Sequence, residues 1–437
     1  MQTIDTILSA PWVVPVVPEG KVLEQHSILL HQGIIHDIIP SSEITGRYTT
    51  KHHIKLDSHI LMPGFVNAHC HTPMNLMRGV ADDVPLKTWL EKHIWPLEGK
   101  WADDRFCADG TEMALAELIR SGSTCLADMY FFPEASAEVI NDAGFRASIG
   151  LTVIEFPTKW AQTTDEYFER CIEVHNEYQY HPLISSHFAP HAPYTVSDDS
   201  MRRIRTLCDE LEIPIQMHIH ETSREVDDSI AEFGVRPLER LENLGLLGPD
   251  LMAVHMTDLT DDEIKLIAER GVHVMHCPES NMKLASGICP VPRLQEAGIN
   301  VALGTDGTAS NNDLCMIGEM KSAAMLAKIG SGDATAVSAE RALSMATING
   351  AKALGLGDKI GSLENGKQAD IIAIDMSELE QLPLFHPVSQ VVYSADKRLV
   401  TDAWIAGKHV MKDRELTSLD LDEILFKARQ WQSKLSQ

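Results

Sequence analysis

The sequence predicts an α/β fold, a distorted (β/α)8 TIM barrel with a small β-sandwich domain built from both ends of the chain. Two observations lead to this prediction. Between residues 59 and 370, short apolar segments alternate with segments whose apolar residues recur at helical spacing. Residues 1–58 and 371–437 instead hold β-branched and aliphatic runs broken by turn residues, which is typical of strands. We therefore expect two domains with these bounds.

The barrel prediction depends on eight apolar segments of strand length. Together with the segments between them they extend over roughly 250 residues, the size of a TIM barrel. The predicted strands are FVNAH (65–69), STCLADM (123–129), ASIGLTVI (147–154), LISSHFA (183–189), IPIQMHI (213–219), LMAVHM (251–256), VHVMH (272–276) and NVALGTD (300–306). Helical patterns separate most of them, at 110–122, 165–178, 200–212, 261–271 and 314–330. An open doubly wound sheet is the alternative, but no G-x-G-x-x-G fingerprint follows any of these strands.

The terminal domain is predicted from short aliphatic runs near both ends of the chain. WVVPVVPEGK (12–21) and HSILLHQGIIHDIIP (26–40) lie in the first part, and Gly33 in the second run predicts a hairpin turn. The segments IIAIDM (371–376) and 390–410 have the same character. We expect these runs to form one β-rich domain.

Composition restricts the partners of the protein. The formal net charge of -26 disfavours nucleic acid and anionic membranes through long-range repulsion, and a small-molecule substrate is easier to reconcile with that field. The 8 cysteines lack paired spacing, which indicates reduced thiols and a cytoplasmic location. We expect no signal peptide and no membrane helix, because no apolar run approaches the roughly 20 residues that a span requires.

Two histidines mark the end of the first predicted strand. Residues i and i+2 of a strand point to the same face, so His69 and His71 can enter one cavity. Barrel enzymes keep their active sites at the carboxyl ends of the strands, where this pair lies. An isolated H-x-H is nevertheless most often a pair of ordinary hydrogen-bonded histidines. The residues at the other predicted strand ends distinguish between these two interpretations.

Polar residues recur at those other strand ends. His218 ends the fifth strand, His255 ends the sixth, and Asp306 ends the eighth beside glycines. Buried histidine and aspartate need partners, and one divalent cation would satisfy several of them at once. The set His69, His71, His218 and Asp306 suits one Zn²⁺ ion, with Fe²⁺ the next candidate. An open coordination position would hold a water, whose pKa the cation lowers towards neutrality.

Four motifs, in this order and spacing, resemble the amidohydrolase superfamily. They are PGFVNAHCHTP, MHIHET, HCPESNMKL and GTDGTASNN, and the later stretch IGSLENGKQADIIAID resembles the return from barrel to sandwich in that superfamily. The subgroup that fits best is the 5-methylthioadenosine/S-adenosylhomocysteine deaminases, which are close to the chlorohydrolase-like and guanine deaminases. The fourth predicted strand and its loop, SSHFAPHAPYTV, lack the carboxylated lysine typical of two-metal members, which supports a single metal.

The resemblance implies metal-dependent hydrolytic deamination of the adenine ring of 5′-methylthioadenosine, with S-adenosylhomocysteine or adenosine as lesser substrates. The alternative is a deaminase or chlorohydrolase acting on another heterocycle, such as guanine, a pterin or an s-triazine. A barrel that has lost catalysis and serves as an interaction scaffold is a third hypothesis, which the intact candidate ligands oppose. The resemblance also implies a homo-oligomer.

Catalytic roles follow from the same resemblance. Glu221, just past the ligand His218, resembles the proton shuttle to the purine ring nitrogen, and it would also contact the substrate. His255 and Asp306 would accept hydrogen bonds from the attacking water and steer it, and Asp306 would also face the substrate. His191 resembles the substrate-binding histidine of the deaminases.

Substrate-binding roles for the nucleoside are implied at three more positions. Glu98, in the W-P-x-E context, matches a glutamate that binds the ribose hydroxyls, and a charged carboxylate suits a vicinal diol. Arg146 matches an arginine assigned to substrate binding. Only Lys159 offers a basic group for a homocysteine carboxylate, which favours methylthioadenosine over S-adenosylhomocysteine. His220 is expected to face the cavity without binding metal.

Overall fold

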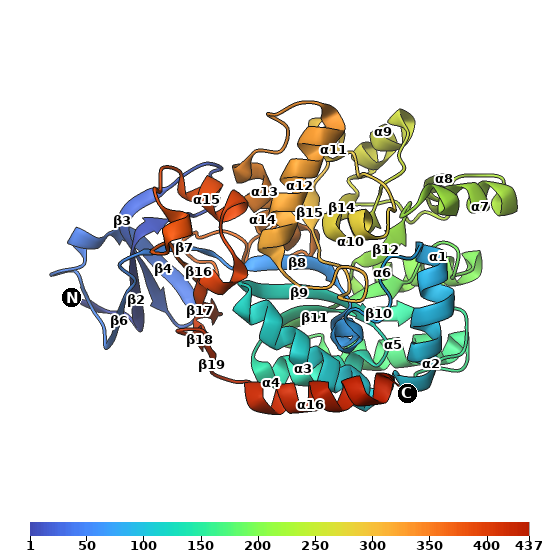
Figure 1. Ribbon diagram of the computed structural model, residues 1–437, viewed down its shortest axis with the longest axis horizontal. Coiled ribbons are helices and arrows are strands. Elements are labelled where there is room, and N and C mark those ends of the chain that lie inside the picture. Colours follow the sequence, from blue (N-terminus) through green and yellow to red (C-terminus); the bar gives the residue numbers. More distant parts are fainter. Residues whose placement is uncertain (437) are drawn as a thin grey trace.

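A parallel eight-stranded sheet forms the centre of the larger domain in the computed structural model, which describes residues 1–436 (Figure 1). Each strand pairs with the next one along the chain, in the order in which they follow the sequence. The strands are β8 (Phe65–Cys70), β9 (Ser123–Tyr130), β10 (Arg146–Val153), β11 (Ile184–Pro190), β12 (Ile215–Ile219), β13 (Leu251–His255), β14 (His273–His276) and β15 (Val301–Leu303). This arrangement confirms the predicted barrel.

Helices cover the outside of this sheet. They are α3 (Asp104–Arg120), α4 (Pro133–Ala143), α5 (Thr164–Tyr178), α6 (Asp198–Leu211), α7 (Ser223–Phe233), α8 (Pro237–Asn243), α9 (Asp261–Arg270), α10 (Pro278–Lys283), α11 (Val291–Glu296), α12 (Met316–Ser331), α13 (Ala339–Met345) and α14 (Ile348–Ala353). Asp103, Thr163, Ser197, Thr222 and Thr260 each accept a backbone N–H of the first helical turn, so short polar side chains fix where these helices begin. None of the helices in residues 1–436 combines the length and apolar character of a membrane span.

The seam between the last strand and the first closes the barrel. Asp306 N donates to His69 O at 3.0 Å, and the Asn67 side chain bonds both the backbone N and the hydroxyl of Thr305, at 3.0 and 2.8 Å. The two segments approach so closely that a Cβ on Gly304 would lie 2.8 Å from the His69 backbone nitrogen. Only glycine fits there, and the closure places Asp306 directly beside β8.

Both ends of the chain contribute to one nine-stranded sheet at the left of Figure 1. Its strands are β2 (Thr6–Val13), β3 (Leu23–His31), β4 (Ile34–Pro40), β6 (His52–Lys55), β7 (His59–Pro63), β16 (Ile371–Asp375), β17 (Val400–Ile405), β18 (Lys408–Lys412) and β19 (Glu415–Leu416), and β1 (Gln2–Thr3) pairs separately with β5 (Tyr48–Thr49). Leu30 of β3, Leu61 of β7 and Trp404 of β17 belong to the same buried cluster. The sheet therefore curls around its own core and encloses it as a sandwich does.

Three features of the chain ends differ from the expected layout. Part of the expected strand region 390–410 is helical, because Pro387 begins helix α15 (Pro387–Tyr393). Strand β7 pairs with β16 and β2, so it belongs to the terminal sheet, although it lies past residue 58. We propose that the domain division lies after Pro63. Short one-turn helices, η1 (Ser41–Glu43), η4 (Leu379–Gln381) and η5 (Lys397–Leu399), connect the strands of this region.

The C-terminal helix α16 (Leu421–Leu435) packs against the barrel, not against the terminal sheet (Figure 1). Trp431 Nε1 donates to Asp109 Oδ2 of α3 at 2.8 Å, and its ring lies edge-on to Phe106, with centroids 5.3 Å apart. The same ring contacts Trp101, the last residue of α2 (Trp95–Trp101), at 6.1 Å. Helix α16 therefore supports the segment that follows the first barrel strand.

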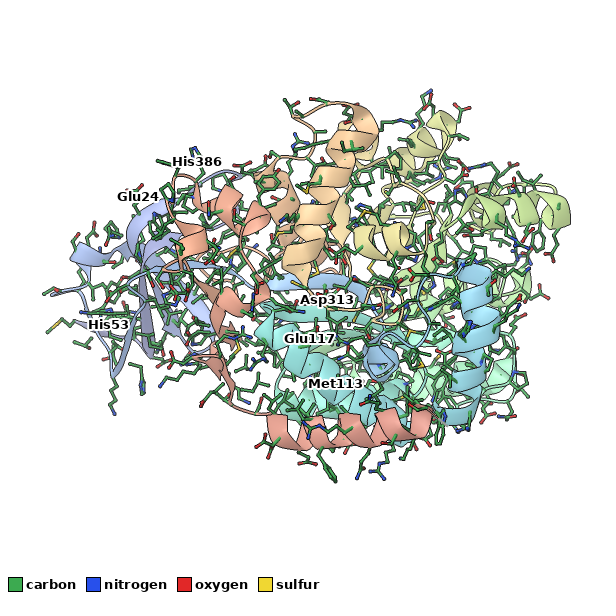
Figure 2. All side chains as sticks on the ribbon, in the orientation of Figure 1. Glu24, His53, Met113, Glu117, Asp313 and His386 are labelled. Atoms are coloured by element: carbon green, nitrogen blue, oxygen red, sulfur yellow. The ribbon has the colours of Figure 1, made fainter. Side chains whose placement is uncertain are left out.

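Charged side chains also join the two domains. Lys397, from the terminal region, lies 3.3 Å from Glu117 of α3 and 3.1 Å from Asp313, and Figure 2 shows these two carboxylates close together in the centre of the molecule. Arg78 pairs with Glu117 from the other side and donates to Asn312 O at 2.9 Å. This network of ion pairs and hydrogen bonds fixes the position of residues 312 and 313, which follow the barrel seam.

The predicted substrate contact of Arg146 is wrong. Arg146 begins strand β10, so it lies at the amino end of the strand, opposite the end where barrel sites form. Its guanidinium is buried and binds Asp370 through Nε at 2.7 Å and a second nitrogen at 2.9 Å. It therefore connects the barrel floor to the terminal sheet.

Replacing Arg146 with Met should destabilise the protein by about 3–5 kcal/mol, because Asp370 would remain buried without its charged partner. Urea denaturation followed by circular dichroism measures the change. The matched control is Arg224→Met, which removes an exposed pair with Asp228 and should cost about 1 kcal/mol or less. Equal effects of the two substitutions would contradict a structural role for Arg146.

Candidate active site

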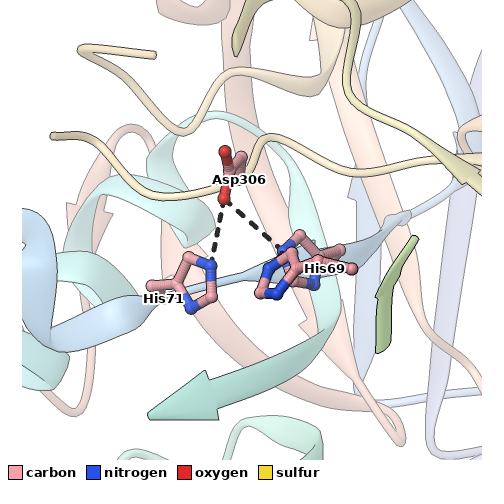
Figure 3. Close-up of side chains that lie close together, drawn as sticks. His69, His71 and Asp306 are labelled. Carbon is pink, nitrogen blue, oxygen red and sulfur yellow. Dashed lines mark hydrogen bonds and ion pairs between the residues drawn. The ribbon is translucent and has the colours of Figure 1, made fainter. Parts of the chain in front are cut away.

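Four side chains converge at the carboxyl end of the barrel. His71 Nε2 lies 3.0 Å and His69 Nε2 3.5 Å from Asp306 Oδ1, as Figure 3 shows, and His218 Nε2 lies 3.2 Å from His69 Nε2. One potential ligand atom from each of the four lies within 4.8 Å of the others. All four residues are buried. The structure therefore brings together the set that the sequence predicted.

Each imidazole is held through its other ring nitrogen. His69 Nδ1 donates to Gln216 Oε1 at 2.7 Å, His218 Nδ1 to His191 O at 2.7 Å, and His71 Nδ1 to the carbonyl of Met129. These acceptors fix a proton on each Nδ1, so each Nε2 points into the cluster and can coordinate a cation when it is unprotonated. His69 Nε2 and His218 Nε2 lie 3.2 Å apart, and with both Nδ1 atoms protonated neither Nε2 of the neutral rings can donate to the other, so a cation between them would stabilise the pair.

Asp306 completes this electrostatic arrangement. Its Oδ2 accepts hydrogen bonds from Ser280 Oγ at 2.6 Å and Ser310 Oγ at 2.8 Å, which leaves Oδ1 directed at the histidines. Burial opposes ionisation of Asp306, but hydrogen bonds and charge from His69 and His71 hold its pKa well below the usual value. Burial also lowers the pKa of His71, but the Asp306 carboxylate outweighs it and raises the value to about 8, so without a cation His71 holds a second proton on Nε2 and donates it to Asp306. A bound cation would take the place of that proton.

This donor set fits a divalent cation. Three imidazole nitrogens and one carboxylate oxygen, each oriented by a second hydrogen bond, are the ligands that Zn²⁺ and Fe²⁺ accept. Burial lowers the pKa of His69 to about 4, so its ring is neutral and ready to coordinate near neutral pH. The cluster therefore meets the chemical requirements of a metal site.

Glu221 and His255 lie beside the cluster. The Glu221 carboxylate is 3.9 Å from His255 Nε2, and its backbone N–H donates to Glu225 Oε2 at 2.8 Å. His255 Nδ1 donates to Asn281 Oδ1 at 2.9 Å, which leaves Nε2 as an acceptor. Burial and the Asp306 charge raise the pKa of Glu221 to about 8, so this carboxyl can gain and release a proton near neutral pH.

A small chamber of about 70 Å³ adjoins these groups, and residues from several loops line it. Glu98, on α2, and His191, after β11, both belong to this lining. Glu98 Oε1 accepts a hydrogen bond from Tyr130 Oη at 2.8 Å, and burial raises the Glu98 pKa to about 7. Trp89, at the end of α1 (Leu86–Trp89), also lines the chamber, next to the single π-helical turn η3 (Leu90–Ile94).

The prediction for His220 is wrong. Strand β12 ends at Ile219, and His220 takes a positive φ of 52°, which breaks the strand alternation. Its ring turns away from the chamber, so that Nδ1 donates to Asp258 O at 2.7 Å and Nε2 accepts from Leu238 N at 3.4 Å. His220 therefore holds the loop after β13 in place.

Several residues that orient the candidate ligands were not predicted from the sequence. Gln216 lies two positions before His218 in β12, so the strand period could have found it. Ser280 lies inside the HCPESNMKL motif, and Ser310 inside GTDGTASNN, but short polar motif residues carry no signal for a specific partner. Tyr130 ends an apolar strand and gives no indication of its bond to Glu98. The one-turn helix η2 (Thr72–Met77), which follows His71, was also not anticipated.

The family description "Amidohydrolase family" matches residues 60–410. The chain belongs to this amidohydrolase family. The predicted membership is therefore confirmed, and with it the expected enzyme class, a hydrolase that acts on carbon–nitrogen bonds. Members of the amidohydrolase family use a metal, in agreement with the donor set described above.

Similar proteins cover almost the whole chain. A 5-methylthioadenosine/S-adenosylhomocysteine deaminase from Teredinibacter turnerae is 50% identical over 433 residues, 99% of this chain and 98% of its own length. The protein of the same name from Saccharophagus degradans is 48% identical, over 99% of this chain and 97% of its own. A crystal structure of an adenosine deaminase from Xanthomonas campestris with bound zinc is 50% identical and superposes with a TM-score of 0.99, covering 100% of this chain and 99% of the other.

Replacing Gln216 with Met should weaken cation binding about 10–100-fold, because His69 loses the acceptor that orients its ring. Competition with a chelator of known affinity measures the change. Ser186→Ala serves as the control, since it removes a buried 2.8 Å hydrogen bond to His175 outside the cluster and should leave cation affinity unchanged. An unaltered affinity in the Gln216 variant would refute the orienting role.

Proposed function

We propose that this enzyme hydrolytically deaminates the adenine ring of 5′-methylthioadenosine and related adenosine nucleosides, giving the inosine analogue and ammonia. The observation that carries the proposal is that Glu221 lines the same small chamber as His71, His218 and Asp306 of the four-ligand cluster, with Glu98 also on its wall. The names of the relatives support it, because both a 5-methylthioadenosine/S-adenosylhomocysteine deaminase and an adenosine deaminase share about half of their residues with this chain.

His69, His71, His218 and Asp306 would hold one Zn²⁺ ion, with Fe²⁺ as the other candidate. When bound, such a cation supplies a Lewis acid that makes water nucleophilic near neutral pH. The zinc in the Xanthomonas campestris structure favours Zn²⁺ for this site. The same donor set favours an active enzyme over a scaffold that has lost catalysis.

Glu221 would serve as the proton carrier. Deamination adds water to the ring carbon that bears the amine, and the neighbouring ring nitrogen takes a proton before ammonia leaves. The raised pKa of Glu221 lets it accept a proton from water and donate it to the ring nitrogen. His255, through the free Nε2, and Asp306 would accept hydrogen bonds from the attacking water and orient it.

The remaining polar groups of the chamber would bind the nucleoside. An ionised Glu98 can accept hydrogen bonds from both ribose hydroxyls, while Tyr130 holds the carboxylate in position. His191 Nδ1 bonds to Thr195 Oγ1 at 3.0 Å, which leaves Nε2 available to the substrate. A buried carboxylate of this kind favours a nucleoside over guanine, a pterin or an s-triazine, none of which carries a ribose.

The cysteines and the net charge support a location and a class of partner for the enzyme. All 8 cysteines are free and buried, which supports a reducing, cytoplasmic location. The net charge of -26 supports a small-molecule partner in place of nucleic acid. Assembly into a homo-oligomer stays a prediction from the family resemblance.

Incubation of the cation-loaded enzyme with 5′-methylthioadenosine should convert the adenine ultraviolet spectrum into that of hypoxanthine, with ammonia released in equal amount. Glu221→Gln should lower kcat by a factor of about 10²–10⁴, because proton transfer is lost, while the bound cation is retained. An enzyme-coupled ammonia assay and metal analysis test both points. A lack of turnover by the fully loaded wild-type protein would end the proposal.

The Glu98 carboxyl should give the reaction a pH dependence. Its raised pKa means that it is protonated below about pH 7, where it can no longer accept two hydroxyl hydrogen bonds. We therefore expect kcat/KM for nucleosides to fall as the pH drops through about 7. The Glu98→Gln variant should have a kcat/KM about 10–100-fold lower than the wild type and should not show this fall with pH. Glu91→Gln, an exposed glutamate on the same segment, is the control and should match the wild type.

A further inference from the structure

The short segment between β12 and α7 determines where the Glu221 side chain points. His218 and Glu221 both line the chamber, although they are three positions apart in the sequence. In a continuous strand, residues three apart point to opposite faces, so Glu221 would face away from the chamber. The strand ends at Ile219, and the positive φ of 52° at His220 reverses the alternation. The direction of Glu221 therefore depends on the backbone conformation of His220.

The left-handed conformation of His220 needs support from other parts of the chain. This conformation is unfavourable for a residue with a Cβ, and it persists where the surrounding structure enforces it. The segment IQMHIHETSRE (215–225) contains no glycine that would adopt such a backbone readily. Contacts from outside the turn, which we define as His220 and Glu221, must therefore hold it.

Glu225, the third residue of α7, binds the two N–H groups of this turn. Its Oε1 accepts the His220 N–H at 3.0 Å, and its Oε2 accepts the Glu221 N–H at 2.8 Å. In a capping box, a glutamate at this position accepts the N–H of the N-cap residue, as Glu263 does for Thr260 in α9. The Glu225 side chain reaches further back and bridges two successive peptide groups. Both of its oxygens keep lone pairs for these donors in either protonation state.

Thr257, two residues after β13, binds the carbonyl groups of the same turn. Its N–H donates to His220 O at 2.9 Å, and its hydroxyl donates to Glu221 O at 2.8 Å. The loop that follows α10 packs closely on this hydroxyl, since a Cβ on Gly287 would lie 2.7 Å from Thr257 Oγ1. The turn is therefore held through its N–H groups by one element and through its carbonyl groups by another.

Neither of these two side chains belongs to the chamber. Among residues 1–436, the chamber lining includes Glu221 but neither Glu225 nor Thr257. A substrate in the chamber would therefore touch Glu221 and not the two residues that hold its backbone. Any influence of Glu225 or Thr257 on proton transfer has to pass through the position of Glu221.

We propose that Glu225 and Thr257 are positioning residues, which fix the turn of His220 and Glu221 and thereby direct the Glu221 carboxyl into the chamber. This inference rests on the proposed function, because the proton transfer that depends on the turn is the one assigned to Glu221. It adds two residues to the reaction that neither contact the substrate nor bind the cation.

A double-mutant cycle on kcat tests the inference, with the cation-loaded enzyme and 5′-methylthioadenosine. Glu225→Gln replaces one acceptor oxygen with an amide nitrogen that cannot accept, and it should lower kcat about 10–100-fold because Glu221 is displaced. In the Glu221→Gln background, the same substitution should lower kcat by less than about twofold, since the group through which it acts is already absent. Equal losses in the two backgrounds would overturn the inference.

A matched control separates this role from a general effect of the start of a helix. Glu166 is likewise the third residue of α5, and it accepts the N–H of Gln162, the residue before the N-cap, at 2.7 Å. This N–H occupies the same place relative to its helix as that of Glu221. Glu166→Gln should leave kcat at the wild-type value. A loss as large as that of Glu225→Gln would contradict a specific role for Glu225.

Thr257 provides a second test, which decides the question if Glu225→Gln fails to fold. Thr257→Val removes the hydroxyl at nearly constant size and should lower kcat, whereas Thr257→Ser keeps the hydroxyl and should retain it, with equal cation content in both variants. Crystal structures should show the Glu221 carboxyl turned out of the chamber in Thr257→Val only. The same carboxyl position and the same kcat in both variants would refute the assignment.

The wild-type enzyme distinguishes a failure of this inference from a failure of the proposed function. If the fully loaded wild-type protein does not deaminate 5′-methylthioadenosine, the proposed function fails. If the wild type is active but the double-mutant cycle is additive, only the positioning role fails.

Discussion

Closure of the barrel between its last and first strands is the constraint on which the active site depends. The backbone bond from Asp306 to His69, and the fit of Gly304 against the same residue, bring the eighth strand end beside the first. Without that contact, the histidines of β8 and the carboxylate of the final loop would belong to opposite edges of an open sheet. The barrel thus creates a four-ligand cluster that no two neighbouring strands could supply.

The electrostatics of the cluster explain why so many polar groups tolerate burial there. Carbonyl and amide oxygens from inside the barrel hold a proton on each Nδ1, and two serine hydroxyls occupy the outer oxygen of Asp306. The three Nε2 atoms and Asp306 Oδ1 are left directed at one point. Without a cation, the protonated His71 beside Asp306 offsets part of the cost of burying these groups. A divalent cation bound at that point would supply the positive charge in its place.

The two-residue period of β-strands predicted most of the site residues that could be predicted from the sequence. It placed His69, His71 and His218 on the cavity face, because alternation is a property of regular strands. Asp306 was expected to end the eighth strand, whereas β15 ends at Leu303 and Asp306 follows in a left-handed conformation at the seam. The errors lie where regularity ends. His220 sits in a left-handed conformation just past its strand, so strand spacing from His218 misplaced it, and Arg146 sits at the amino end of β10, so the family match misplaced it. Thr257 holds the backbone of Glu221 from a loop that is distant in sequence, and no local pattern encodes their meeting.

The docking of the final helix separates the supports of the two parts of the active site. Trp431 reaches Asp109 across 322 positions of the chain, and it also touches Trp101, the end of the short helix that carries Glu98. The four candidate ligands all lie between residues 69 and 306, and none of them touches this helix in the contacts described. The wall that would recognise the sugar therefore leans on the last helix of the chain, whereas the cluster does not.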